Sequence, residues 1–299
     1  MSARTQRATW LPPVAYLFLA PALSIIGVFF LLPVAGALVL SLTDFDIYGL
    51  ADVGNVRWIG WQNSRELLAA PLFWQALGNT CYFALVGGPL SVAASLSVAL
   101  LLTSRHAAGQ TLFRTIFFAP VVTTLVAAAV VWRYLYHTDY GLINGLLGHL
   151  GVGAVDWLGD PRFAMPAIIL MAVWKNFGYN AVIFIAGLQA IPPELYEAAR
   201  VDGASAAQRF FRVTVPMLAP TFAFVGVTTM IGYLQLFAEP YVMTQGGPLH
   251  STYSVVLMMY EEGFRWWNLG YASAVAFALF VVILLFTIVQ LRLQRGASL

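Results

Sequence analysis

The chain has 299 residues, of which 60% are hydrophobic and only 9% are charged, and its formal net charge is +2. Since about a quarter of the residues in a soluble globular protein are charged, no water-soluble domain of this length could bury so much apolar surface. The composition therefore excludes a soluble protein and predicts an all-α integral membrane protein, because helices satisfy their own backbone hydrogen bonds in lipid.

The first apolar stretch could be mistaken for a secretory signal peptide, because Arg4 and Arg7 precede it. It runs from Val14 to Leu40, however, which is longer than the apolar part of a signal peptide. We therefore interpret it as an uncleaved first membrane span. This span divides the chain into an N-terminal segment, 1–13, and a transmembrane domain, 14–299.

Apolar windows of about 20 residues mark membrane-spanning helices. The sequence contains six such windows, at 14–40, 74–103, 115–136, 163–188, 217–240 and 270–291. It therefore predicts about six transmembrane helices. The glycines within these spans are expected to let helices pack closely: Gly178, Gly187, Gly226 and Gly232.

The positive-inside rule orients the spans, because arginine and lysine are concentrated in cytoplasmic loops. With the N-terminus in the cytoplasm, the inner side receives Arg4, Arg7, Arg105, Arg114, Arg200, Arg209, Arg212, Arg292 and Arg295. The outer side receives only Arg57, Arg65, Arg133, Arg162 and Arg265. We therefore expect both termini in the cytoplasm, with Lys175 left inside a span.

The loop between the fourth and fifth spans, 189–216, is cytoplasmic in this orientation and has two helical patterns. Pro192 and Pro193 suit the first positions of a helix, and Glu194 suits its first turn. Gly203 is expected to end this helix in a left-handed conformation. Such a short helix with small residues can dock on another protein, although a structured loop without a partner would have the same pattern.

This loop resembles the EAA motif of binding-protein-dependent ABC importer permeases. Glu197-Ala198-Ala199 is followed by Asp202-Gly203 and, after nine intervening residues, by Val213-Thr214-Val215-Pro216. Valine stands at 213, where the family often has isoleucine. The resemblance implies a coupling helix that docks in the ATPase subunit through Glu197, Ala198, Ala199, Asp202 and Gly203.

Two further stretches, 240–248 and 270–274, resemble the carbohydrate branch of these permeases and its MalF-like subunit. The resemblance implies a type I ABC importer permease fold in the bacterial cytoplasmic (inner) membrane. It also implies a second homologous permease subunit, two ATPase subunits and an extracytoplasmic solute-binding protein as partners. The expected function is ATP-driven import of an oligosaccharide or disaccharide by alternating access. No cofactor is expected in this chain, since ATP and Mg would bind the ATPase subunits, and no nucleic acid is expected as a partner.

Polar side chains inside spans are costly, so each of them is a candidate for the substrate route. The fourth and fifth spans hold Lys175, Asn176, Tyr179, Asn180, Tyr233, Gln235 and Glu239. Amides and carboxylates can hydrogen-bond sugar hydroxyls. Asn176 or Gln235 could instead join helices, and Lys175 could form a structural ion pair with Glu239 or contact a neighbouring subunit. The many tryptophans, such as Trp10, Trp157, Trp266 and Trp267, are expected to be interfacial anchors rather than a sugar site.

Three other functions remain as alternatives. The same architecture could import glycerol phosphate or another polar solute, although an anion site would require clustered cations. An ion-driven secondary transporter is disfavoured because the two halves show no internal repeat. An intramembrane enzyme would require a catalytic or metal-ligand constellation, and none is recognisable in the spans, so the chain is expected to be a transport subunit without its own ATPase site.

Overall fold

The structure is a computed structural model that describes residues 13–103 and 110–297. Arg4, Arg7 and Arg105 of the predicted inner loops lie outside these residues. All regular elements in the described part are helical: α1 (Pro13–Ile26), η1 (Gly27–Leu31), α2 (Leu32–Ser41), α3 (Ile47–Ala51), η2 (Val53–Asn55), α4 (Gln62–Ala69), α5 (Pro71–Tyr82), η3 (Phe83–Gly87), α6 (Gly88–Thr103), α7 (Gln110–Val122), α8 (Leu125–Leu135), α9 (Leu142–His149), α10 (Pro161–Gln189), α11 (Pro193–Val201), α12 (Ala206–Arg209), η4 (Phe210–Thr214), α13 (Val215–Met217), α14 (Ala219–Leu234), α15 (Ala238–Met243), α16 (Val255–Tyr260), η5 (Glu261–Arg265) and α17 (Leu269–Ala297).

Five helical stretches are long and apolar enough to cross a membrane, or six if a bent pair of helices counts as one span. They are Tyr16–Ser41, Pro71–Thr103, Pro161–Gln189, Ala219–Met243 and Leu269–Leu293, together with the pair Thr115–Val122 and Leu125–Leu135. These positions confirm the predicted all-α membrane architecture.

The third span differs from the single continuous helix expected over 115–136, because its second half is bent by 108° from the direction of the first. The break lies at Thr124, whose backbone is extended and whose hydroxyl accepts a hydrogen bond from the Ala127 N–H. Thr124 is therefore the N-cap of α8, and a threonine in this position starts a new helix rather than continuing the old one.

The fifth span is also interrupted, although 217–240 reads as continuous apolar sequence. Helix α14 ends at Leu234, and α15 begins only at Ala238. Phe237 between them has φ −144° and ψ −63°, which is not helical. The interruption matters because residues 235–239 line a cavity there, among them the polar Gln235 and Glu239.

The chain divides into two compact units. Unit 1 comprises Met1–Leu67 and Glu262–Phe277, and unit 2 comprises Leu68–Glu261 and Ala278–Leu299. In unit 1, the most apolar window of Tyr16–Ser41 has none of its residues buried. Nearby, the Asn63 amide donates to the backbone oxygens of Ser41 and Thr43 and fixes the loop that follows α2.

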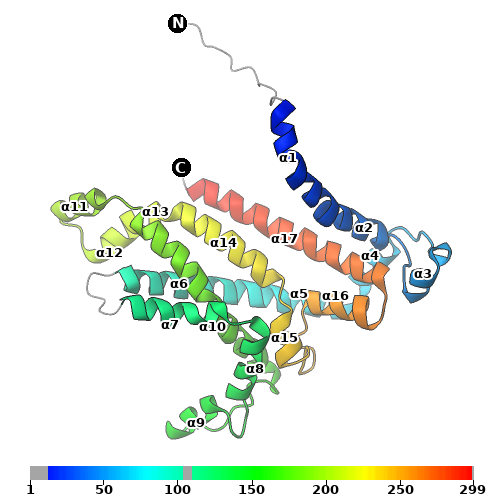
Figure 1. Ribbon diagram of the computed structural model, residues 1–299. Helices are drawn as coiled ribbons and strands as arrows, with labels where there is room; N and C mark the ends of the chain where they lie inside the picture. Colours follow the sequence, from blue (N-terminus) through cyan, green and yellow to red (C-terminus); the bar gives the residue numbers. More distant parts are fainter. Residues whose placement is uncertain (1–12, 104–109, 298–299) are drawn as a thin grey trace. The chain divides into compact units, whose positions relative to one another are not determined.

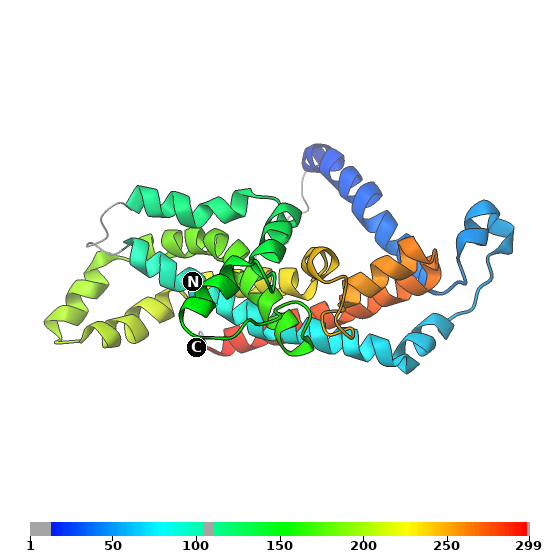
Figure 2. The ribbon, with the colours of Figure 1, turned by 90° about the horizontal axis from the view of Figure 1, so that it is seen from below.

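Unit 2 is built around α10, which packs against α6, α7 and α14 (Figures 1 and 2). One apolar cluster contains Phe83, Ile168, Met171 and Leu234, and a second contains Phe184 and Leu218. Figure 1 shows α11 and α12 at one end of α10 and α8 and α9 at the other. Many apolar side chains on the outside of this unit, such as Leu170 and Val182, remain exposed, as expected where lipid is the solvent.

Close approach of α7 to α10 depends on one glycine. A Cβ atom at Gly178 would lie 2.2 Å from the Phe117 carbonyl oxygen. The prediction of close packing is therefore confirmed at Gly178, and also at Gly187, where a Cβ would lie 2.6 Å from the Thr221 hydroxyl oxygen. It is wrong at Gly232, which has open space around the Cβ position.

The segment 136–160 between α8 and α10 is organised by the buried side chain of Asn144. Its amide nitrogen donates to the Thr138 and Val155 oxygens at 3.0 and 2.8 Å. Its amide oxygen accepts from the Val155 N–H and from the Trp157 indole at 3.3 and 2.9 Å. Trp157 is therefore a half-buried, hydrogen-bonded part of this segment, and its role as an interfacial anchor stays a prediction.

Replacing Asn144 by alanine is expected to open this segment without unfolding the membrane helices. Four hydrogen bonds are lost, and the groups left unsatisfied cost about 2 kcal/mol or more. Limited proteolysis of the purified protein should cleave between Thr138 and Trp157 faster than in the unsubstituted chain. His149→Ala, on the exposed side of α9, is the control; equal cleavage of both variants would contradict the role of Asn144.

Candidate functional site

The predicted coupling helix is α11, and its end is fixed by Gly203. Gly203 has φ +74°, its N–H donates to the Arg200 oxygen, and the Ala204 N–H donates to the Ala199 oxygen at 2.9 Å. These two bonds form the Schellman arrangement that satisfies the last carbonyls of a helix. The prediction that Gly203 ends this helix in a left-handed conformation is confirmed.

The next helix, α12, is fixed by hydrogen bonds at its N-terminus. The Ser205 hydroxyl accepts from the Gln208 N–H, and the Gln208 side chain accepts from the Ser205 N–H, which is a capping box. The Arg209 guanidinium donates to the Ala204 oxygen at 2.7 Å. The turn between α11 and α12 is thus fixed on both sides. The spacing of Ser205 and Gln208 carries this signal, which the sequence analysis missed.

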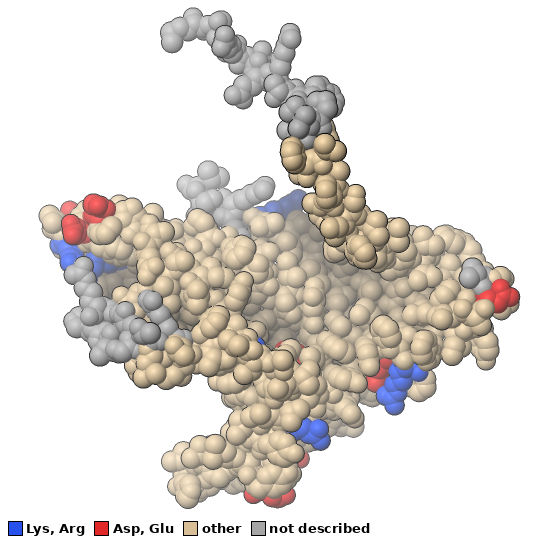
Figure 3. Space-filling model, viewed as in Figure 1, with Lys and Arg blue, Asp and Glu red and all other residues tan. Residues whose placement is uncertain are grey.

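The residues expected to contact an ATPase are accessible in this chain. Glu197, Ala198, Asp202 and Gly203 are exposed, and Ala199 is half-buried. Figure 3 shows acidic and basic side chains gathered at the α11–α12 end, whereas the surface over the long helices is almost free of charge. A short rigid helix with a charged edge is a suitable surface for another protein.

The polar residues of the fourth and fifth spans meet around one cavity of unit 2, of about 430 Å³. Six of the seven predicted route residues line it: Asn176, Tyr179, Asn180, Tyr233, Gln235 and Glu239. They come from α10, α14, α15 and the break between the last two. We call this the polar cavity. Its size lies in the range of small-molecule sites.

The polar residues of this cavity differ in exposure and in hydrogen bonding. The Tyr233 ring is buried and stacks on Phe83, but its hydroxyl has no hydrogen-bond partner within the described residues. Ser91 and Asn176 lie near this hydroxyl without making a hydrogen bond of acceptable geometry. The Gln235 side chain is exposed to the cavity. A buried hydroxyl without a partner is costly unless water or a ligand occupies the space beside it.

Two amides of the cavity have structural bonds. Asn180 donates to the Thr229 hydroxyl at 2.9 Å and so joins α10 to α14. Asn176, for which a link between helices was the alternative, instead donates to the Ala172 oxygen of its own helix and lines the cavity. The link is made by Asn180, for which it was not predicted.

Lys175 is not among the residues that line the polar cavity. Its buried ammonium donates to the Val121 oxygen at 3.3 Å. Glu239, also buried, is near enough for the two charges to attract each other. Within the described residues, however, no ion pair within 4.0 Å joins them, so the alternative of a close Lys175–Glu239 ion pair is not realised. Glu239 is the one charged residue among those that line the cavity.

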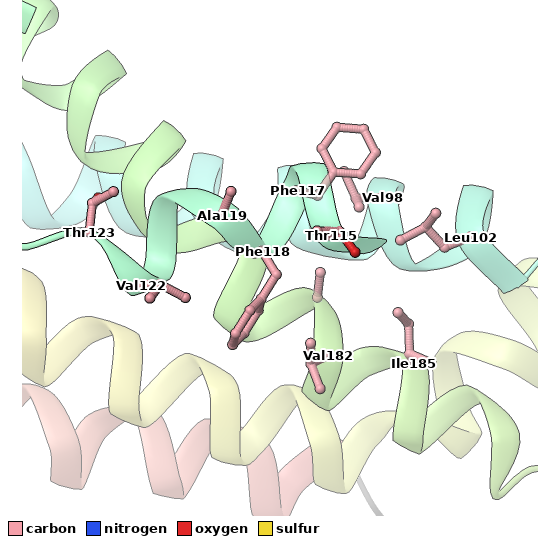
Figure 4. A pocket seen from close by; sticks show the side chains of 12 residues that line it. Val98, Leu102, Thr115, Phe117, Phe118, Ala119, Val122, Thr123, Val182 and Ile185 are labelled. Carbon is pink, nitrogen blue, oxygen red and sulfur yellow. The ribbon is translucent and has the colours of Figure 1, made fainter. Parts of the chain in front are cut away.

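A second and larger cavity, of about 750 Å³, is a poor site for a polar solute. Figure 4 shows Val98 and Leu102 of α6, Phe118 of α7 and Val182 and Ile185 of α10 around it. Only two threonines among its lining residues are polar. Apolar walls cannot hydrogen-bond hydroxyl groups, so the smaller polar cavity is the better candidate site.

Comparison with known proteins gives the family context. Residues 67–298 match the family described as "Binding-protein-dependent transport system inner membrane component". The lactose transport system permease protein of Rhizobium radiobacter is 35% identical over 285 residues, which cover 94% of this chain and 93% of that protein. The trehalose/maltose transport system permease protein of Thermococcus litoralis is 36% identical, with 94% of each chain covered.

Another relative transports a phosphorylated solute, and one solved structure shows the fold. The sn-glycerol-3-phosphate transport system permease protein of Pectobacterium atrosepticum is 31% identical and covers 96% of this chain and 94% of its own. The crystal structure of a bacterial ABC transporter involved in the import of the acidic polysaccharide alginate matches with a TM-score of 0.78, 23% identity and 95% of both chains covered. The same fold occurs in that transporter's complex with a pentasaccharide-bound periplasmic protein, at 22% identity and a TM-score of 0.78.

Proposed function

Because the chain belongs to the family of binding-protein-dependent transport system inner membrane components, we propose that it is the ABC permease subunit through which a neutral oligosaccharide or disaccharide is imported. The family is one of transport subunits in the inner membrane rather than of enzymes. The observation that carries the choice of solute is the polar cavity, where amide, hydroxyl and carboxylate groups converge beside the unpartnered Tyr233 hydroxyl.

Charge favours a neutral solute over a phosphorylated one. A phosphate site would need a cation directed at the ligand. The charged residue that lines the polar cavity is the acidic Glu239. Lys175 is not a lining residue, and its ammonium donates to the Val121 oxygen. The sugar relatives support this choice, and the glycerol phosphate relative supplies the competing candidate for the test.

The proposed assembly contains a second homologous permease, two ATPase subunits that bind ATP and Mg, and an extracytoplasmic solute-binding protein. Both termini and α11 would lie on the cytoplasmic side. Closure of the ATPases would displace α11, and the spans would then turn the polar cavity outward to receive the solute. The exposed Glu197, Ala198, Asp202 and Gly203 support this docking role.

The test is solute uptake by proteoliposomes that contain the complete complex, its binding protein and ATP. Labelled maltose, lactose and glycerol 3-phosphate serve as probes. We expect ATP-dependent uptake of a neutral disaccharide. Uptake of glycerol 3-phosphate alone would overturn the assignment of a neutral solute, and uptake driven by an ion gradient without ATP would overturn the importer mechanism.

Tyr233→Phe is expected to weaken uptake by removing a buried hydroxyl of a cavity residue that has no hydrogen-bond partner within the described residues. The loss of one hydrogen bond to the solute corresponds to about a two- to tenfold decrease in kcat/KM for uptake. Thr228→Val is the matched control, because this cavity threonine already donates to the Phe224 oxygen of its own helix at 2.8 Å. Equal uptake by Tyr233→Phe and the unsubstituted complex would remove Tyr233 from the solute site.

A further inference from the structure

Helix α11 touches the rest of its own chain through very few side chains. Of the residues from Pro193 to Val201, only Tyr196 and Ala199 are half-buried, and the other seven are exposed. Val201, at the end of the helix, is 88% exposed. Since alanine has a single methyl group, Tyr196 is the one large half-buried side chain of α11, and Leu195 is 40% exposed.

Tyr196 makes two kinds of contact. Its ring packs on the apolar cluster at the base of α10 and α14, which contains Phe184, Ile191 and Leu218. Its hydroxyl lies 3.0 Å from the hydroxyl oxygen of Thr214, and either group can be the donor. Thr214 is buried and Tyr196 is half-buried, so water has only limited access to this hydrogen bond. A hydrogen bond is stronger where water is partly excluded.

Thr214 is joined without a gap to the fifth span. Its backbone oxygen accepts from the Leu218 N–H at 3.0 Å, and the Leu218 oxygen accepts from the Phe222 N–H at 2.8 Å. The hydrogen-bonded backbone then continues as α14, whose far end at Tyr233 and Leu234 adjoins the polar cavity. A displacement of Thr214 is therefore a displacement of the helix that carries cavity residues.

We propose that Tyr196 and Thr214 are a positioning pair that transmits movement of α11 to α14 and thereby to the polar cavity. The pair rests on the proposed function, because it assumes that an ATPase moves α11. Without the hydroxyl contact, α11 is still attached at both ends. It can then tilt about those ends when the ATPases close, and less of its movement reaches α14.

The test compares Tyr196→Phe, Thr214→Val, the double variant and Thr214→Ser in the complete complex in lipid nanodiscs. Hydrogen–deuterium exchange is measured in the resting state and after trapping with ATP and vanadate. Exchange is followed in two segments: α11 itself, and residues 232–239 around the interruption between α14 and α15. Thermal unfolding and ATP hydrolysis of each complex are measured alongside, since a merely structural role would change these first.

In both single variants we expect exchange of the α11 amides to rise about two- to tenfold, as the loss of one hydrogen bond implies. The ATP-dependent change at 232–239 should fall by a similar factor while complex stability and ATP hydrolysis stay close to normal. The double variant should show the same exchange of α11 and the same reduced change at 232–239 as either single variant, because each single substitution already removes the one hydrogen bond. Thr214→Ser keeps the hydroxyl and should restore the response.

Two results would overturn the pair, and they are distinguishable. If α11 is protected by the ATPase in every complex but the change at 232–239 is the same in Tyr196→Phe and Thr214→Val as in the unsubstituted chain, the pair is wrong and the coupling function stands. If α11 of the unsubstituted complex gains no protection from the ATPase, the proposed coupling function fails and the pair fails with it.

Discussion

Replacing Gly203 by valine is expected to abolish solute uptake while the membrane domain still folds. Gly203 has φ +74°, and a β-branched residue is strongly disfavoured there. A Cβ at this position would meet no atom of the chain within 4 Å, so the penalty comes from the backbone and not from a steric clash. The strain of about 1–2 kcal/mol is expected to unwind the end of α11 and to misplace Glu197 and Asp202.

The measurements are co-purification of the ATPase with the permease, uptake in proteoliposomes and thermal unfolding of the membrane domain. Gly203→Asn is the matched control, because asparagine adopts the left-handed conformation far more readily than valine. We expect this variant to retain much of the uptake. Full uptake by Gly203→Val would show that the Schellman turn is not needed for coupling.

Replacing Gly178 by alanine is expected to destabilise the whole of unit 2. The added Cβ would lie 2.2 Å from the Phe117 oxygen and 3.2 Å from a methyl carbon of Val121. A backbone carbonyl cannot rotate away as a side chain can, so α7 must move off α10. We expect a loss of about 3 kcal/mol, which is at the upper end for overpacked cores.

The matched control is Gly78→Ala in α5, where an added Cβ meets no atom within 4 Å. There the same substitution is expected to stabilise the helix by up to about 1 kcal/mol, because alanine has the higher helix propensity. The melting temperatures of the purified Gly178→Ala and Gly78→Ala variants are compared by thermal unfolding. An unchanged melting temperature for Gly178→Ala would mean that α7 is free to shift without cost.

The coupling segment was predictable to a large extent because its signals are local. Pro193 at the first helical position, Glu194 in the first turn and Gly203 after the last turn act on neighbouring backbone groups. The interaction of Tyr196 with Thr214 was not predictable in the same way. It joins residues 18 positions apart, and no spacing rule relates them.

The polar residues of the substrate route could be recognised in the sequence, but their arrangement around one cavity could not. Their cost in lipid singles them out in sequence, yet Lys175 proves to lie outside the polar cavity and Asn180 to link two helices. The sequence analysis also missed Thr228, Thr229 and Phe237, which line the cavity. Threonine and phenylalanine are common in membrane helices, so no sequence signal marks them.

The sequence by itself determined the membrane class, the approximate spans and the helix that ends at Gly203, because hydropathy and helix capping depend on residues close together along the chain. Only the tertiary structure decided the bend at Thr124, the interruption after Leu234 and the polar cavity between them. Bends and cavities depend on contacts between distant segments, such as Asn180 with Thr229, and such contacts exist only after the helices have packed.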